Sequence, residues 1–333
     1  MKGHQITLGI YRGRAVAALV TDGVLEDLLV DVDAPRPGAI YRAKASRPMK
    51  GQGGMFFETP EGNAFLRGAR GFAPGDTALV QVSGYAEPGK AIPVTDRLLF
   101  KSRYAIATAG APGINVSRSI RDEKVRADLL DLVEPHAKRL ETHGLILRSA
   151  AQDALTQDIA EDIARVIDTL SLVMADQGSG CEKLIEGPDV AELAWREWPL
   201  VTPVEEDIAG FVDQALQVAV PLPGGGRIFV EPTRACVAID VNTGTDTSPA
   251  AGLKANIAAS RALPRQLRLK GLGGQIVVDF APAPKRDRRS IEQALRAAFR
   301  ADSTETTLLG WTNLGHFELT RKRARPVLHE VFP

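Results

Sequence analysis

The stretch Ala235–Gly244, ACVAIDVNTG, is apolar like a buried strand until polar residues appear near its end. Asp240, Asn242 and Thr243 supply a carboxylate, an amide and a hydroxyl, and Gly244 allows the chain to turn sharply. Asn242 lies two residues after Asp240, so in an extended chain both side chains point to the same side. The stretch therefore predicts a strand with ligand-binding side chains at its carboxyl end.

A second stretch, GGQIVVDFA at 273–281, ends in the same way, with Asp279 after three apolar residues. The intervening KANIAASRALPRQLRLK predicts a helix that Gly271 closes and that Pro264 kinks or divides. A strand, a helix and a strand in this order predict a right-handed crossover between parallel neighbours. Because ligands collect at the carboxyl ends of such strands, we expect Asp240 and Asp279 to face one crevice of a largely buried sheet.

Two buried carboxylates repel each other unless a cation lies between them. Mg²⁺ commonly binds through one or two carboxylates and keeps several waters, so this pair favours a divalent metal site. Asn242 would then hold a metal-bound water or a phosphate. The alternative is that each aspartate caps the helix that follows its strand.

The net charge of the 333 residues is zero, but the charges are unevenly distributed. Residues 261–325 hold 14 Lys or Arg against six Asp or Glu, whereas residues 151–213 hold three against 15. A basic region can bind a polyanion, although solvated helix faces would give the same pattern. The candidates for contact with a nucleic-acid backbone are Arg265, Arg268, Lys270 and Arg286. Of these, Arg265 and Arg268 share a helix face.

Residues 36–102 contain five short strands separated by Gly and Pro: AIYRAKA, GMFFET, NAFLRG, TALVQVS and KAIPVT. Five strands with regular turns predict a small barrel of the oligonucleotide-binding (OB) type. Phe56, Phe57 and Phe65, with Arg67 nearby, would suit the stacking of bases beside a phosphate-binding groove. The alternative is that the barrel needs these rings for its core. Phe56 and Phe57 are neighbours, so one should point inward and the other outward.

Several classes of protein are disfavoured by the composition. The sequence contains no run of about 18 apolar residues, so no membrane span is expected, and its first residues do not resemble a signal peptide. The two cysteines, Cys181 and Cys236, are not in a CxxC pair, so neither a disulfide framework nor a cysteine zinc site is expected. This cysteine usage is typical of a cytoplasmic protein.

With these motifs the sequence resembles the ribonuclease E/G family. AIDVNTG resembles the family's first metal-aspartate motif, ANIAASRALPRQLRLKGLGGQIVVDF its helix and second aspartate strand, and NLGHFELTRKRARPVL its closing stretch. The resemblance implies an α/β nuclease core, with RNase H-like and DNase I-like subdomains, and an inserted S1-type barrel of the OB fold. The implied domains are a trimmed RNase H-like subdomain at 1–35 and 176–203, the barrel at 36–102, a 5′-sensor-like region at 103–175 and a DNase I-like catalytic subdomain at 204–333.

The resemblance implies a Mg²⁺-dependent endoribonuclease, with Mn²⁺ as an alternative metal, acting on single-stranded RNA in processing, including that of rRNA, or decay. It would leave 5′-phosphate ends. Asp240 and Asp279 would hold the metal, and Asn242 would position the metal-bound water or the phosphate. In GLILRSA, Arg148 and Ser149 stand where the family senses a 5′-monophosphate.

The sequence also departs from the family pattern. It lacks the CxxC zinc-link, so we expect no zinc and no zinc-linked tetramer, while a homodimer through the nuclease subdomain stays open. Ser-Thr-Glu-Thr at 303–306 lacks a second basic residue for the 5′-phosphate pocket, and Pro282 replaces an acidic residue. Two alternatives stand: an RNA-binding member with little or no cleavage activity, and a metal-dependent phosphatase or other α/β enzyme acting on a small substrate.

Overall fold

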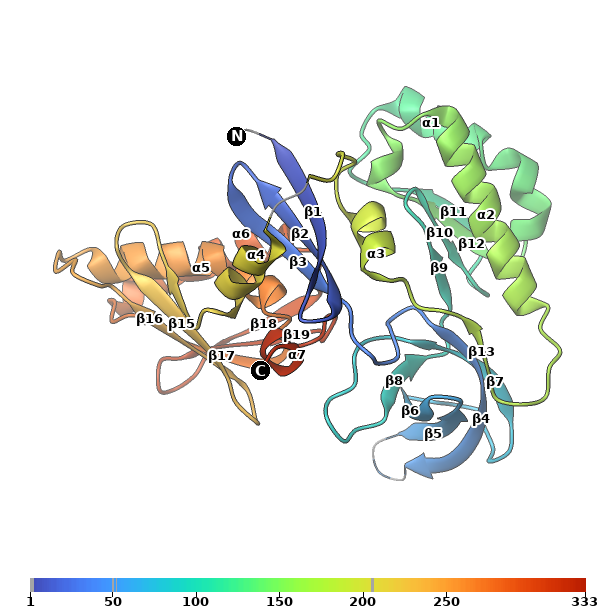
Figure 1. Cartoon of the computed structure of the whole chain (residues 1–333), viewed down its shortest axis with the longest axis horizontal. Helices are drawn as coiled ribbons and strands as arrows, with labels where there is room; N and C mark the ends of the chain where they lie inside the picture. Colours follow the sequence, from blue (N-terminus) through green and yellow to red (C-terminus); the bar gives the residue numbers. More distant parts are fainter. Residues whose placement is uncertain (1–2, 50, 52, 205–206) are drawn as a thin grey trace. The chain divides into compact units, whose positions relative to one another are not determined.

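The computed structural model describes residues 3–49, 51, 53–204 and 207–333. The chain divides into two compact units, one made of Met1–Asp33 with Pro199–Pro333 and the other of Ala34–Trp198 (Figure 1). The first unit carries the predicted acid pair, and the second carries the predicted barrel.

The first unit begins with an antiparallel three-stranded sheet of β1 (His4–Tyr11), β2 (Arg14–Thr21) and β3 (Val24–Val30). Asp22 and Gly23 form the turn between β2 and β3, with positive φ angles of 50° and 81°. Val16, Ala18 and Val30 pack against apolar side chains of α4 (Ile208–Leu216) and α7 (Leu328–Val331). This small sheet therefore shares a core with the C-terminal part of the chain.

The second sheet of this unit has six strands in the order β14-β15-β16-β17-β19-β18. Its strands are β14 (Ala219–Pro221), β15 (Arg227–Pro232), β16 (Val237–Asn242), β17 (Gly274–Asp279), β18 (Thr306–Trp311) and β19 (Phe317–Arg321). All neighbours are antiparallel except β16 and β17, which are parallel as predicted. The helix between them is α5 (Ala251–Leu269), and η3 (Lys285–Asp287) and α6 (Arg288–Arg300) follow β17.

Only one face of this sheet is buried, which corrects the expectation of a largely buried sheet. Ile239 and Val278 point toward α5 and α6, and the intervening residues of β16 are exposed. The strands therefore alternate, as in sheets with one solvated face. Pro264 does not divide α5, which runs continuously until Gly271 turns the chain with a φ of 66°.

The second unit contains the predicted five-stranded barrel. Its strands are β4 (Ile40–Met49), β5 (Gly54–Thr59), β6 (Gly62–Arg67), β8 (Ile92–Thr95) and β7 (Thr77–Val82), and pairing of β4 with β7 closes it. β13 (Glu182–Ile185) pairs with β4 at the outside. A closed five-stranded barrel is the S1-like OB architecture expected from the sequence.

The rest of this unit contains a four-stranded sheet in the order β11-β12-β10-β9. Its strands are β9 (Leu99–Lys101), β10 (Ala105–Thr108), β11 (Gly113–Val116) and β12 (Gly144–Leu147). The helices are α1 (Glu123–Asp131), η1 (Glu134–Leu140), η2 (Ser149–Ala151), α2 (Thr156–Met174) and α3 (Val190–Glu197). The buried face of α2 includes Ile159, Ile163 and Leu170. No helix within the described ranges is long and apolar enough to cross a membrane.

Candidate active site

Asp240 and Asp279 are direct partners in the parallel pairing of β16 with β17. Cross-strand partners point to the same face of a sheet, and neighbouring strands lie about 4.8 Å apart. Both aspartates are exposed on the face that α5 and α6 leave open, and the side chain of Asp279 is 64% exposed. The predicted juxtaposition is confirmed, but the predicted burial is wrong, since the two residues alternate with the buried residues of their strands.

Asn242 lies on the same face, two residues beyond Asp240. Its Oδ1 accepts a hydrogen bond from the backbone N–H of Gly244 at 2.8 Å, which fixes the side chain. Gly244 has a φ of 67°, and a Cβ there would lie 2.3 Å from the carbonyl oxygen of Gly225. Because the oxygen is held internally, the –NH₂ group of Asn242 is the part left to face a ligand.

The end of β17 is held in place by α5. The buried side chain of Asn256 donates to the carbonyl oxygen of Ala281 and accepts from its N–H, both at 2.9 Å. Ala281 lies two residues beyond Asp279, so this two-point contact fixes the backbone that presents the carboxylate. ANIAAS therefore contributes a positioning residue that the sequence analysis had not singled out.

The donor set fits a hard divalent cation that keeps most of its water. Within the described ranges, no three His, Cys, Asp or Glu side chains form a metal-binding group. Mg²⁺ binds through one or two protein carboxylates and keeps several waters, so two carboxylates facing open solvent suit it. They do not suit a metal that needs ligands from the protein on all sides. Mn²⁺ also accepts carboxylate and water ligands.

Three more side chains lie beside the acid pair, and sequence reasoning missed all of them. Phe229 of β15 is the partner of Asp240, and exposed Arg227 is the partner of Asn242. His316, in the turn before β19, brings its Nε2 within 3.8 Å of an Asp279 carboxylate oxygen. The strand register brings these residues beside the aspartates, and the sequence patterns did not fix that register.

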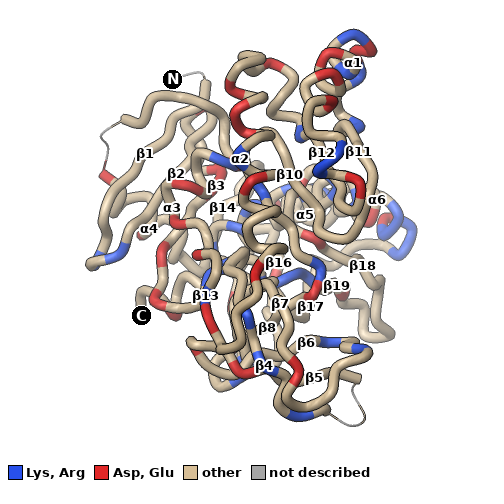
Figure 2. The backbone as a smooth tube through the Cα atoms, turned by 90° about the vertical axis from the view of Figure 1, so that its right-hand side faces the viewer, with Lys and Arg blue, Asp and Glu red and all other residues tan. Residues whose placement is uncertain are grey.

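Arg265 and Arg268, which were predicted to contact RNA, instead form ion pairs within the protein. Both do share a helix face, but this face meets β3, where each makes an ion pair with Glu26. Arg268 also pairs with Asp27 and with the buried Asp302. In contrast, Arg286 has an 86% exposed side chain, and it precedes the basic residues of α6 (Figure 2). Of the basic residues predicted here, Arg286 stays a candidate for RNA contact.

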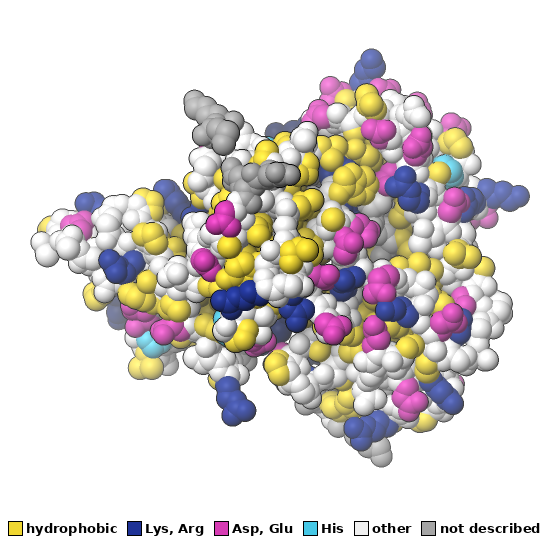
Figure 3. Space-filling model, in the orientation of Figure 1, with side chains coloured by type: hydrophobic (Ala, Val, Ile, Leu, Met, Phe, Trp, Pro, Cys, Tyr) yellow, Lys and Arg dark blue, Asp and Glu magenta, His cyan; other side chains and the backbone are white. Residues whose placement is uncertain are grey.

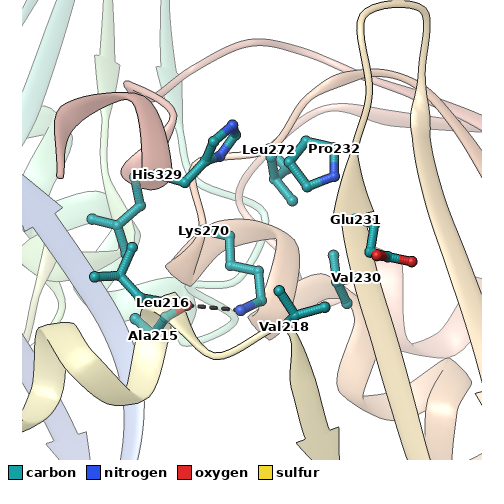
Figure 4. A pocket seen from close by; sticks show the side chains of 10 residues that line it. Ala215, Leu216, Val218, Val230, Glu231, Pro232, Lys270, Leu272 and His329 are labelled. Carbon is teal, nitrogen blue, oxygen red and sulfur yellow. Dashed lines mark hydrogen bonds between the residues drawn. The ribbon is translucent and has the colours of Figure 1, made fainter. Parts of the chain in front are cut away.

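Lys270 is also directed inward, so its predicted RNA contact is wrong. It is 6% exposed, and its Nζ donates to the carbonyl oxygens of Ala215, at 2.7 Å, and Gln217. The ammonium thereby satisfies carbonyls at the end of α4. Lys270 lines a pocket of about 310 Å³. Figure 4 shows it beside other lining residues, which include Leu272 and His329. Neither this pocket nor the neighbouring one, around Cys236, includes the acid pair.

Lys270 should make stability depend on pH. Burial lowers its pKa from 10.5 to about 8. Between these values the unfolded chain binds more protons than the folded chain, so the free energy of unfolding should rise with pH. Lys270→Met should remove this rise, which amounts to at most about 3 kcal/mol. Urea unfolding of both proteins at pH 7.5 and pH 10 measures the difference, and identical pH dependence would contradict the assignment.

The exposed surface of the barrel carries an aromatic pair. Phe57 is completely buried, so its predicted contact with RNA is wrong, whereas Phe56 points outward. The Phe56 and Phe65 ring centroids are 5.0 Å apart, and the Arg47 guanidinium lies 5.0 Å from the Phe56 ring. Phe65 lies over Gly54, where a Cβ would be 2.2 Å from Cζ of the ring. Phe65 can occupy this position because residue 54 has no side chain.

Arg148, one of the two predicted 5′-phosphate ligands, already has an anionic partner. Its Nη2 donates to Glu197 at 2.5 Å, and its Nη1 donates to the carbonyl oxygen of Ser102 at 2.6 Å. Burial raises the pKa of Glu197, but the charges of Arg148 and Arg196 outweigh burial and leave the pKa below its ordinary value. Ser149 is exposed. An incoming phosphate would therefore compete with an ionised carboxylate.

We expect poor discrimination between 5′ ends in any cleavage assay. Oligonucleotides with a 5′-monophosphate or a 5′-hydroxyl should be cleaved at similar rates, because Arg148 is already ion-paired with Glu197. Glu197→Gln should raise the monophosphate preference about tenfold, the effect of one freed charge-assisted contact. Glu192→Gln on the same helix is the control. A strong preference in the unaltered protein, unchanged by Glu197→Gln, would contradict this expectation.

An S1-like barrel combined with an α/β sheet that presents paired carboxylates defines a nucleic-acid-processing class of protein. Lys/Arg and Asp/Glu side chains intermingle on the visible surface of each unit, so charge alone does not mark a site there (Figure 3). The model of the Ribonuclease E/G family matches residues 100–199 and 192–324. The chain belongs to this family.

The relatives that it matches are longer. It is 25% identical to ribonuclease G of Salmonella typhimurium (strain SL1344) over 390 residues, covering 94% of this chain and 78% of that one. Ribonuclease E of Nostoc sp. is 26% identical, with 95% of this chain and 56% of that one covered. Ribonuclease G of Haemophilus influenzae is 26% identical, with 99% and 82% covered. These alignments exceed 333 positions, so the relatives carry insertions that this chain lacks.

Proposed function

We propose that this protein is a Mg²⁺-dependent endoribonuclease that cleaves single-stranded RNA, leaves 5′-phosphate ends and acts in RNA processing or decay. The observation that carries the proposal is the register of β16 and β17, which pairs Asp240 with Asp279 on an open sheet face. Family membership supports RNA as the substrate, since the relatives are named ribonucleases.

Asp240 and Asp279 would hold the metal, with Mn²⁺ as an alternative. The bound ion would supply Lewis acidity and an activated water. The –NH₂ group of Asn242, whose oxygen is fixed by Gly244, would donate a hydrogen bond to the scissile phosphate. Arg227, one position along the open face, adds a positive charge for the same group. These donors would hold the phosphate while the acid pair holds the metal.

The family also supports a finer description of the fold. We assign residues 204–333 to a DNase I-like catalytic subdomain, and the strands within 1–35 to a trimmed RNase H-like subdomain. Residues 36–102 would form the S1-type domain, and 103–175 the 5′-sensor-like region. A homodimer through the nuclease subdomain accords with this assignment.

The decisive experiment uses 5′-labelled, AU-rich single-stranded RNA with Mg²⁺, Mn²⁺ or EDTA. We expect internal cleavage with either metal and none with EDTA, and downstream products that a 5′-phosphate-dependent exonuclease degrades. Binding without metal-dependent cleavage would support the second candidate, an RNA-binding member of the family. Within the described residues, no third His, Cys, Asp or Glu completes a metal-binding group with the acid pair, and this observation favours the second candidate.

The aromatic pair of the barrel supports RNA over a small phosphorylated substrate. Phe56→Ala and Phe65→Ala should each weaken RNA binding by roughly five- to thirtyfold, because stacking contributes about 1–2 kcal/mol per base. Phe56→Tyr keeps the ring and should bind nearly normally. Fluorescence anisotropy with labelled RNA measures this. Unchanged RNA binding by both alanine variants would show that this face of the barrel does not contact RNA.

A further inference from the structure

The strand register places four side chains in one row across the open face. Phe229 is the partner of Asp240, and Asp240 is the partner of Asp279. The pairing of β17 with β19 ends at Val278 with Phe317, so the next position places His316 opposite Asp279. The 3.8 Å separation of His316 and Asp279 agrees with this order. An aromatic ring therefore stands on each side of the acid pair.

The rings of Phe229 and His316 are both partly exposed. Phe229 is half-buried, between the completely buried Ile228 and the buried Val230, which point toward the helices. The side chain of His316 is 36% exposed. Cross-strand contact with a carboxylate gives an aromatic ring little apolar burial, so packing within the sheet accounts poorly for Phe229 at this position.

The spacing of the row suits an extended nucleic-acid strand. Neighbouring strands lie about 4.8 Å apart, so Phe229 and His316 stand roughly 14 Å apart with the two aspartates between them. Phenylalanine and histidine rings both stack on unpaired bases. A strand running across the sheet would place one phosphate over the aspartates and a base near each ring.

We propose that Phe229 and His316 form an aromatic bracket that binds the two nucleosides flanking the scissile phosphate of single-stranded RNA. The proposal rests on the proposed function, because that function supplies the substrate. The bracket would set the register of the RNA on the acid pair and favour unpaired nucleotides, whose bases are free to stack.

The test measures binding separately from cleavage. Phe229→Leu and His316→Leu are made in an Asp240→Asn background, and binding of a short, labelled, single-stranded RNA is measured by anisotropy. Each should weaken binding by roughly five- to thirtyfold. Phe229→Tyr and His316→Tyr, which keep a ring, should restore binding to within about threefold. Gln275→Ala, at an exposed position of β17, is the matched control and should bind normally.

Two results would overturn the bracket. One is unchanged RNA binding by both leucine variants, with thermal unfolding showing that they are folded. The other is tyrosine variants that bind no better than leucine variants, because a stacking surface would then be irrelevant. Failure of the proposed function would show elsewhere, as absence of metal-dependent cleavage by the unaltered protein.

Discussion

Asp279→Asn should abolish RNA cleavage while leaving RNA binding nearly intact. The carboxylate shares an open sheet face with Asp240, and together they supply the negative charge that would retain a divalent ion. Loss of one ligand charge should remove several kcal/mol of transition-state stabilisation, a fall of at least about 10³-fold in rate. Asp240→Asn should give the same result, since the two residues would hold one ion. Single-turnover cleavage at saturating protein measures the rate.

Metal binding provides a second readout. Mn²⁺ added to the unaltered protein should give a bound signal in electron paramagnetic resonance, and either asparagine variant should lose it. Glu231→Gln is a matched control, because Glu231 is exposed on the same face but is the partner of Ala238 rather than of an aspartate. Cleavage at the normal rate by Asp279→Asn would exclude the acid pair as the centre of the reaction.

Asp302→Asn should strongly destabilise the first unit. Asp302 and its ion-pair partner Arg321 each have a 1% exposed side chain, and Arg268 is also paired with Asp302. Removing the carboxylate leaves the Arg321 guanidinium without its buried counter-charge, which costs about 3–5 kcal/mol. Burial already lowers the pKa of Arg321, and Asp302 opposes that shift. The midpoint of urea unfolding, followed by a probe in the 199–333 part, measures the loss.

The control for this change is the same substitution on the surface. Asp128→Asn in α1 alters an exposed aspartate and should change stability by no more than about 0.5 kcal/mol. Equal unfolding midpoints for Asp302→Asn and the unaltered protein would show that the ion pairs of Asp302 with Arg268 and Arg321 contribute no net stability. Arg268 also contacts Glu26 and Asp27 of β3. Asp302→Asn should therefore also increase the rate of amide hydrogen exchange in β3.

Local patterns in the sequence were sufficient to predict much of the fold. Short strands separated by turn residues predicted the barrel. A strand, a helix and a strand predicted that Asp240 and Asp279 would be neighbours, because the handedness of this connection is nearly fixed. Membership of the family was also predicted from motifs alone.

The basic residues were harder to interpret, because a positive side chain looks the same whether it meets RNA or an internal carboxylate. Arg268 donates to the backbone of Glu26, 242 residues away in sequence, and Arg148 meets Glu197. Lys270 reaches carbonyls at the end of another helix. No periodicity within a helix reveals such distant partners.

The sequence by itself determined the barrel, the parallel strand pair with the helix between its strands, and the identity of the two acids. These follow from short-range periodicity and from the restricted geometry of connections. Tertiary structure alone decided which face of the sheet stays open, which cations are already neutralised, and that Phe229 and His316 flank the acids. The physical reason is that strand register and helix packing bring together residues that lie far apart along the chain.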